Sequence, residues 1–269
     1  MGYEVKSLDY YVSDREEVRK LLLLAALAGR IMLRSGAETY RVEDTVERLC
    51  KSRKDIRYAD AFATPTGIFI SLEYRSEMMA YLIRVKSIRT DLNRINLVNE
   101  FSRKFVNSNM SIDKGIEHLR YINQINIYNR WGKSIFGSLA CAFFSMLFGG
   151  VFVDFISSFM VSLIILTVIS GIHRYKTRPF LSNFIGATLA AVLSILSIYL
   201  GLGKNIDIII IGSIMSMVPG VAITNAMRDT MSGDLVSGLS RGMEAIFSAL
   251  AIAFGVGMVL NIYFKGLIP

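Results

Sequence analysis

The sequence predicts an α-helical integral membrane bundle of five transmembrane helices, preceded by a small α+β cytoplasmic domain. The first reason is composition: the 269 residues are 52% hydrophobic, with a mean hydropathy of +0.44, which is high for a soluble protein. The second is the distribution of charge, because residues 1–130 hold 22 of the 30 Lys and Arg and 17 of the 22 Asp and Glu. We therefore expect a soluble domain over 1–130 and a transmembrane domain over 131–269.

Four helices are expected in the first domain. Their apolar residues recur at helical spacing, as at Val42, Val46 and Leu49, which share one face. The apolar run LLLLAALAG in the first helix is too short to cross a bilayer, so we assign it to a protein core. By residue number, the four helices are 16–34, 35–50, 91–107 and 112–125.

Three strands are expected between the second and third helices. In residues 55–74 the side chains alternate in character, and β-branched or aromatic residues are common. Thr64, Pro65, Thr66 and Gly67 in the middle of this stretch are a turn signal between two strands. The segment MMAYLIRVKS is a third strand by the same criteria. This order of elements predicts helices packed on one sheet.

Five apolar segments follow Trp131, and each approaches the twenty or so residues that a hydrocarbon core requires. They are 134–152, 154–172, 180–201, 206–226 and 241–264.

The short loops between these segments predict the orientation of the chain. One group of basic residues lies in loops on the side of the basic first domain: Arg174, Lys176, Arg178, Arg228 and Arg241. The opposite side has only Lys204 and Lys265. By the positive-inside rule, the protein is a multi-pass protein of the cell (cytoplasmic) membrane, with its first domain in the cytoplasm and its C-terminus outside.

Several functions are excluded by what the sequence lacks. The charges of the first domain are of mixed sign, which argues against a nucleic-acid partner. Cys50 and Cys141 lie far apart and only two histidines occur, so we expect no metal site. No nucleophilic set and no phosphate-binding loop are apparent, so we expect no enzyme, no catalytic residues, no cofactor and no ATP-driven pump.

The fourth apolar segment contains Pro219 and Gly220, which should kink or break the helix. Broken membrane helices leave backbone polar groups that are tolerated only inside protein or along a wet cavity, and in transporters such breaks bind substrate or ions. The simpler alternative is a plain proline kink.

Polar residues then follow the break and suggest a substrate or ion pathway. Asn225 and Asp229 share one helix face, as do Arg241 and Glu244, and an unpaired Glu244 near the start of the last span would be costly. Thr224 could hydrogen-bond a zwitterion. The alternative is a set of salt bridges that only holds two helices in register.

The first domain has its own dense polar cluster, formed by Glu38, Arg41, Glu43 and Asp44. These residues could form a lattice of salt bridges at a helix N-terminus, which Ser35 or Thr39 would cap. A binding role is the alternative.

Three blocks, RSGAETYRVEDTVERL, ATPTGIFISL and VPGVAITNAMRDTMSGDLVSGLSRGMEA, resemble the threonine/serine exporter family in order and spacing. Members of that family export small hydroxy amino acids, and some relatives export dicarboxylates such as succinate. The fused members have ten spans, whereas this chain resembles the larger component of the split type, with five spans. The resemblance thus implies a second, smaller membrane protein as partner, with a homo-oligomer as the alternative.

The resemblance carries over to particular positions in each block. In the first two blocks these are Gly36, Ala37, Glu38, Thr39, Arg41, Glu43, Thr64, Pro65, Thr66 and Gly67. In the third block they are Pro219, Gly220, Asn225, Arg228, Asp229, Gly233, Asp234, Gly238, Arg241 and Glu244.

Together these features favour an exporter subunit for threonine, serine or a similar small carboxylate. Arg228 or Arg241 would attract the carboxylate, and Asn225 and Thr224 would hydrogen-bond the substrate. The acids Asp229, Asp234 and Glu244 would hold an ammonium group or relay a proton. The sequence leaves open whether the substrate is a dicarboxylate, whether export is coupled to protons, and whether the chain is instead a membrane-anchored sensor or scaffold.

Overall fold

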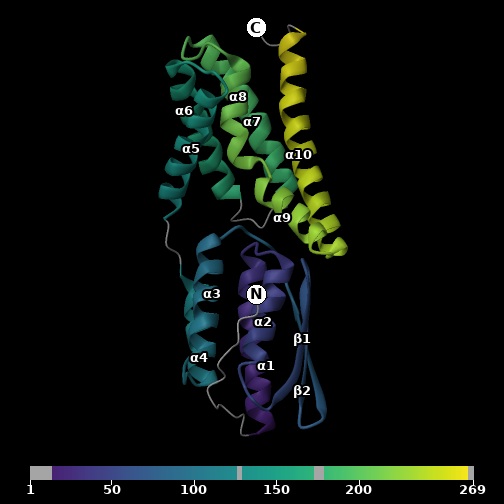
Figure 1. The fold of residues 1–269 in the computed structure, drawn as a ribbon. Coiled ribbons are helices and arrows are strands. Elements are labelled where there is room, and N and C mark those ends of the chain that lie inside the picture. The colour runs from purple at the N-terminus through teal and green to yellow at the C-terminus, as the bar shows by residue number, and fades with distance from the viewer. Residues whose placement is uncertain (1–13, 126–128, 173–178, 266–269) are drawn as a thin grey trace. The chain divides into compact units, whose positions relative to one another are not determined.

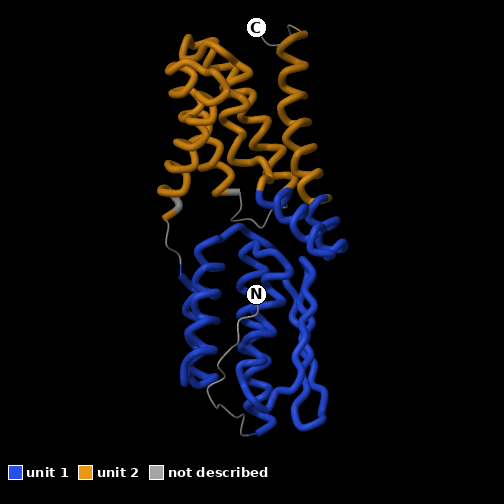
Figure 2. Tube along the Cα trace, viewed as in Figure 1, with its two compact units in different colours: residues 1–125, 221–242 blue, residues 126–220, 243–269 orange. Residues whose placement is uncertain are grey.

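The computed structural model describes residues 14–125, 129–172 and 179–265. The chain forms two compact units, coloured separately in Figure 2. The first joins Met1–Ile125 with Val221–Gly242, and the second joins Asn126–Gly220 with Met243–Pro269. The first unit is therefore discontinuous in sequence.

The predicted helices and strands of the first unit are confirmed, except that the second helix begins at Thr39 and not at residue 35. Its N-cap is Glu38 rather than Ser35 or Thr39. The helices are α1 (Arg15–Arg34), α2 (Thr39–Cys50), α3 (Leu92–Val106) and α4 (Ile112–Gln124). The strands are β1 (Ile56–Thr64), β2 (Gly67–Tyr74) and β3 (Glu77–Arg84), and they form an antiparallel sheet in the order β1-β2-β3.

Helices cover one face of this sheet. In Figure 1, α1 and α2 pack against the strands, and α3 and α4 pack against the helices on the side away from the sheet. Leu24 and Met32 of α1, Ile70 of β2 and Phe105 of α3 are fully or almost fully buried between these layers. The core is therefore continuous from the sheet to α3, and it positions both ends of α1.

The second unit consists of apolar helices. They are α5 (Arg130–Leu147), α6 (Phe152–Ile172), α7 (Pro179–Tyr199), α8 (Ile206–Ile214) and most of α10 (Leu235–Phe264). Helix α8 packs against α5, α6 and α7. The basic connector 173–178, which contributed to the predicted orientation, lies outside the described residues.

The predicted helix break at Pro219 is confirmed. Helix α8 ends at Ile214, a 3₁₀ turn covers Met215–Met217, and a new helix, α9 (Gly220–Met231), begins directly after the proline. Val218 has an extended backbone, as expected for a residue before proline.

Among the described residues, three helices are long and apolar enough to cross a membrane: Phe152–Gly171, Phe180–Tyr199 and Leu235–Phe264. The bent pair Ile206–Met217 and Gly220–Met231 counts as a fourth span if it is one broken span, and Trp131–Leu147 is a shorter apolar helix. The chain is thus a helical membrane protein with a small sheet, and the number of five spans stays a prediction.

Asp154 anchors one end of the second unit. Its buried carboxylate accepts hydrogen bonds from the backbone N–H groups of Val151, Lys204 and Asn205, and from the Asn205 side chain at 2.9 Å. It therefore caps the start of α6 and ties it to the connection between α7 and α8. This satisfied carboxylate has a structural role.

Candidate functional site

Residues 35–39, the connection between α1 and α2 together with the first residue of α2, are held in one conformation by backbone hydrogen bonds. Gly36 has φ +86°, a left-handed value that favours glycine. Its N–H donates to Leu33 O, and the Ala37 N–H donates to Met32 O, which is the Schellman pattern at a helix C-terminus. We call residues 35–39 the motif loop, because they lie in the first of the three blocks.

Residues 221–242 form a helix hairpin within the same unit. Helix α9 ends in a second Schellman turn: Gly233 has φ +92° and its N–H donates to Thr230 O, while the Asp234 N–H donates to Asp229 O. The first turns of α10 follow immediately. We call residues 221–242 the hairpin.

The hairpin binds the backbone of the motif loop at three points. The Asn225 side chain donates to Gly36 O at 2.8 Å, and the Arg241 guanidinium donates to Ala37 O at 2.7 Å. In the other direction, the Thr39 N–H donates to the Asp229 carboxylate at 3.2 Å. These bonds satisfy polar groups of a helix C-terminus and a helix N-terminus at once.

An ion pair lies at the centre of this contact. Arg241 Nε and Asp229 Oδ2 are 3.0 Å apart, with side chains 4% and 0% exposed. These two atoms do not form a hydrogen bond, so the pair is held by the attraction of opposite charges. The other carboxylate oxygen of Asp229 and a terminal nitrogen of Arg241 form hydrogen bonds with the backbone of the motif loop. Such a pair stabilises only if both partners are present, because either one alone is a buried charge.

Further polar contacts join the hairpin to Glu38 and Thr39 of the motif loop. Glu38, which is 6% exposed, forms ion pairs with Arg228 of the hairpin and with Arg41 of α2. The Thr39 hydroxyl donates to the Asp234 carboxylate at 3.0 Å. Five of the seven residues predicted for the substrate or ion pathway therefore bind the motif loop.

The hairpin is amphipathic, but its polar face is buried and its apolar face is exposed, which is the opposite of a surface helix in a soluble protein. Its buried residues include Asn225, Asp229 and Arg241, whereas Met231, Leu239 and other large apolar side chains are exposed. Burial of the polar face against protein leaves an apolar face that suits a lipid-like or protein environment.

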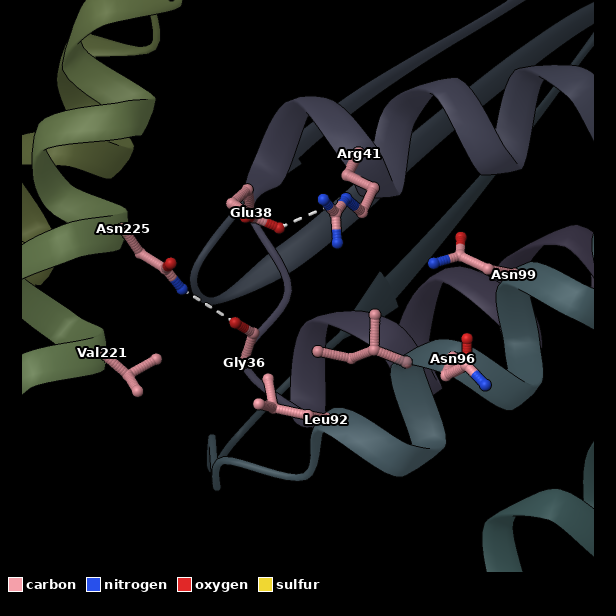
Figure 3. A pocket seen from close by; sticks show the side chains of 9 residues that line it. Gly36, Glu38, Arg41, Leu92, Asn96, Asn99, Val221 and Asn225 are labelled. Carbon is pink, nitrogen blue, oxygen red and sulfur yellow. Dashed lines mark hydrogen bonds and ion pairs between the residues drawn. The ribbon is translucent and has the colours of Figure 1, made fainter.

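A pocket of about 200 Å³ opens beside this contact (Figure 3). Arg41 and Glu38 form one wall, and their ion pair is drawn in the figure. Asn96 and Asn99 point in from α3, and Val221 and Asn225 line the hairpin side. The remaining lining residues are Gly36, Leu92 and Ile95.

Glu43 is an acid with an unusual pKa. It lies on α2, partly buried, and accepts a hydrogen bond from the Ala63 N–H at 2.7 Å. Burial raises its pKa to about 7; the Ala63 bond opposes this, and the nearby acids Asp234, Glu47 and Asp60 add to it. Glu43 therefore titrates near neutral pH.

The structure separates the predicted residues that meet from those that do not. Arg241 pairs with Asp229 rather than with its helix neighbour Glu244, which is exposed and has no ion-pair or hydrogen-bond partner among the described residues. Thr224 is exposed. In the expected lattice of the first domain, Glu38 pairs with Arg41, while Asp44 pairs separately with Arg48.

The second block forms the tip of the β1–β2 hairpin, as predicted. Thr64 and Gly67 pair across the turn that contains Pro65 and Thr66, and the two threonine hydroxyls are 3.1 Å apart. Thr66 O also accepts the N–H of Val85, so the turn holds the chain that leaves β3.

The asparagines of α3 could not be recognised from the sequence. Asn96 and Asn99 are three residues apart and share a helix face, but that face is indistinguishable in sequence from a solvated one. Only the packing of α3 beside the motif loop makes them pocket residues.

The cysteines and acids give no sign of redox or metal chemistry in the described residues. Cys50 and Cys141 are both buried and free, and burial raises the pKa of the Cys50 thiol to about 12. No three His, Cys, Asp or Glu side chains in the described ranges are placed to hold a metal ion.

Comparison with known proteins gives relatives from several organisms. A "Probable threonine/serine exporter" of Mycobacterium tuberculosis is 21% identical over 90% of this chain and 46% of its own length. The "Probable succinate transporter subunit YjjP" of Klebsiella aerogenes is 23% identical over 93% of this chain and 97% of its own length. An "Uncharacterized protein C16A10.01" of Schizosaccharomyces pombe is 26% identical over 68% of this chain and 23% of its own length.

The chain thus spans less than half the length of the mycobacterial and yeast relatives. No solved structure matches it. The sequence profile of the ThrE family, described as "Putative threonine/serine exporter", matches residues 23–263, which include the motif loop, the turn of the second block and the hairpin. The chain therefore belongs to the ThrE family of membrane transporters.

Proposed function

We propose that this protein is a subunit of an exporter that moves small amino acids such as threonine and serine out of the cytoplasm. In this proposal the first unit faces the cytoplasm and its pocket is where the substrate first binds. The chain works with a separate, smaller membrane protein; two copies of this chain are the alternative assembly.

One observation carries the proposal: the first and third blocks of the family motif bind each other beside a polar pocket. The pocket is small compared with the 300–1,000 Å³ or so of drug-sized sites, which suits a metabolite of a few heavy atoms. Five polar or charged side chains line it, and apolar side chains form the rest of its wall. That mixture suits a small polar solute.

The charges that line the pocket favour an amino acid over a dicarboxylate. Arg41 is positive and Glu38 negative, so the lining as a whole is neutral and matches a zwitterion. Arg41 would bind the substrate carboxylate, since its side chain is 40% exposed and a guanidinium matches a carboxylate. Glu38 would face the ammonium group, and Asn96 and Asn99 would hydrogen-bond a hydroxyl.

The proposal revises the roles that the sequence suggested for the third block. Arg228, Asp229, Asp234 and Arg241 would hold the hairpin on the motif loop instead of touching the substrate, because their charged groups are bonded there. Asn225 would serve both purposes, as it bonds Gly36 and lines the pocket.

The test is counterflow in proteoliposomes that contain the chain with and without a candidate smaller membrane partner. We expect uptake of labelled threonine or serine only with both proteins, and a loss of at least tenfold for Asn99→Ala, with Glu100→Gln, the next residue on α3, as the matched control. Uptake of succinate but not threonine would instead assign the chain to dicarboxylate export. Absence of counterflow for all three solutes with every partner would contradict the proposal.

A further inference from the structure

A second pocket lies elsewhere in the first unit and is strongly basic. Its volume is about 270 Å³, and it lies between the last turns of α1 and the chain that leaves β3. Its lining residues are Arg30, Arg34, Arg84, Val85, Lys86 and Ser87.

Four of these six residues are cations and none is an acid. Several other arginines of the unit have a carboxylate partner, as Arg48 has Asp44 and Arg94 has Asp91. Within the described ranges, no ion pair involves any of the four cations of this pocket. Among those residues, no carboxylate forms an ion pair that would offset their mutual repulsion.

Hydrogen bonds hold the backbone segments that carry the four cations, whose side chains are exposed. Arg30 and Arg34 are one helical turn apart on α1. The Arg89 N–H donates to Arg34 O at 2.8 Å, which ties the chain after β3 to the end of α1.

The turn of the second block holds the other side of the pocket. Thr66 O accepts the Val85 N–H at 2.8 Å, and Gly67 is opposite Arg84 in the sheet. A Cβ at Gly67 would lie 3.0 Å from Ile83 O, so a glycine permits this close approach. The block ATPTG, which has no contact with the first pocket, thus positions the basic residues of the second.

We propose that this basic pocket binds a phosphate-bearing anion. Arginine forks pair with phosphate oxygens in bidentate fashion, and three guanidinium groups with one ammonium group match a dianion better than a monocarboxylate. The Ser87 hydroxyl supplies a further donor. The ligand is either a free phosphorylated metabolite or the headgroup of an anionic phospholipid, since both present the same group.

The experiment measures thermal unfolding and binding of the full chain in neutral detergent. The probes are inorganic phosphate and, for the lipid source, dioctanoyl phosphatidic acid below its critical micelle concentration, with dioctanoyl phosphatidylcholine as the zwitterionic reference. We expect at least one anionic probe to raise the Tm, an effect that added salt weakens. Binding of phosphate identifies a free ligand, and binding of phosphatidic acid alone identifies a lipid headgroup.

The decisive variant is Arg34→Gln/Arg84→Gln, which removes one cation from each side of the pocket. We expect affinity for the bound probe to fall at least tenfold. The matched control, Arg57→Gln/Arg120→Gln, changes the net charge equally at exposed sites outside the pocket and should stay within twofold. Arg34→Lys/Arg84→Lys keeps the charge but not the bidentate geometry, so it should lose less affinity than the glutamine pair. An unchanged Tm of both variants without a probe separates loss of binding from loss of folding.

Three results would overturn the proposal. One is that neither anionic probe binds; another is that the control pair loses as much affinity as the pocket pair. The third is that succinate binds and both phosphate probes do not, because the site would then be specific for carboxylates.

Discussion

At the scale of single residues, the pair of Asp229 and Arg241 decides whether the hairpin stays on the motif loop. Both side chains are buried, and each also bonds the loop backbone. Loss of one partner from such a pair typically costs about 3–5 kcal/mol, because the other charge is left in a poorly solvating environment.

We therefore expect Arg241→Ala to lower the Tm of the purified chain and to abolish threonine efflux from preloaded cells. Glu244→Gln is the matched control, because Glu244 is an exposed charged residue one turn further along α10. Surface substitutions usually change stability little, so this variant should keep the Tm within about 1 °C of wild type. Equal Tm losses for both variants would show that the Arg241 contact has no special weight.

Glu43 makes the stability of the first unit depend on pH. Its pKa rises from 4.5 to about 7 in the folded chain, mainly through burial, so the folded state holds a proton that the unfolded state releases between these values. This contribution is fully present below about pH 4.5 and is lost as the pH rises through about 7.

The corresponding variant is Glu43→Gln, which keeps an oxygen for the Ala63 N–H but cannot titrate. We expect the Tm difference between Glu43→Gln and wild type to grow in favour of the variant from pH 5 to pH 8. Asp44→Asn, at an exposed neighbour, should show no such trend. A parallel pair of Tm–pH curves for wild type and Glu43→Gln would contradict the assignment.

At the scale of elements, the two Schellman turns place the groups that meet. The turn at Gly36 presents the carbonyls of Gly36 and Ala37 to the hairpin, and the turn at Gly233 reverses the chain so that Asp229 and Arg241 lie together. The side chains at positions 36 and 37 make none of these bonds, so the contact with the hairpin depends on the backbone conformation of the motif loop.

We expect Gly36→Ala to reduce both Tm and efflux, since an L-residue in the left-handed region costs about 1–2 kcal/mol. Gly36→Asn should be milder, because asparagine tolerates this region. The control Gly132→Ala lies within α5, where a Cβ meets nothing within 4 Å, and should be neutral or stabilising. A harmless Gly36→Ala would mean that the loop adopts its conformation for other reasons.

At the scale of the whole molecule, local patterns in the sequence were sufficient to predict most elements. Helical spacing located α1 to α4, alternation located the strands, and Pro219 located the break between α8 and α9. These features depend on residues a few positions apart, which is the range over which periodicity and turn signals act.

The partners within the site could not be found in the same way. Arg241 has a plausible acid three residues away, Glu244, but it pairs with Asp229 across a turn, and Asn225 bonds a carbonyl 189 residues away. Nothing local marks such a contact. The family resemblance groups the blocks that meet in the structure, yet it does not state which residues touch.

The predicted topology can be tested with the two native cysteines in place, since both are buried and should label weakly. We expect a membrane-impermeant maleimide to label Lys265→Cys in intact cells and to label Arg57→Cys only after lysis, because the five predicted spans would put these exposed positions on opposite sides. Equal labelling of both in intact cells would indicate an even number of spans.

The discontinuity of the first unit imposes an order on biosynthesis. Residues 1–125 are synthesised first, but the segment that completes their unit, 221–242, follows only after the helices α5 to α8. At a synthesis rate of about 5–20 residues per second, this interval lasts roughly 6–23 s. During that time the carbonyls of Gly36 and Ala37 and the carboxylate of Glu38 lack the hairpin partners that bind them in the complete unit.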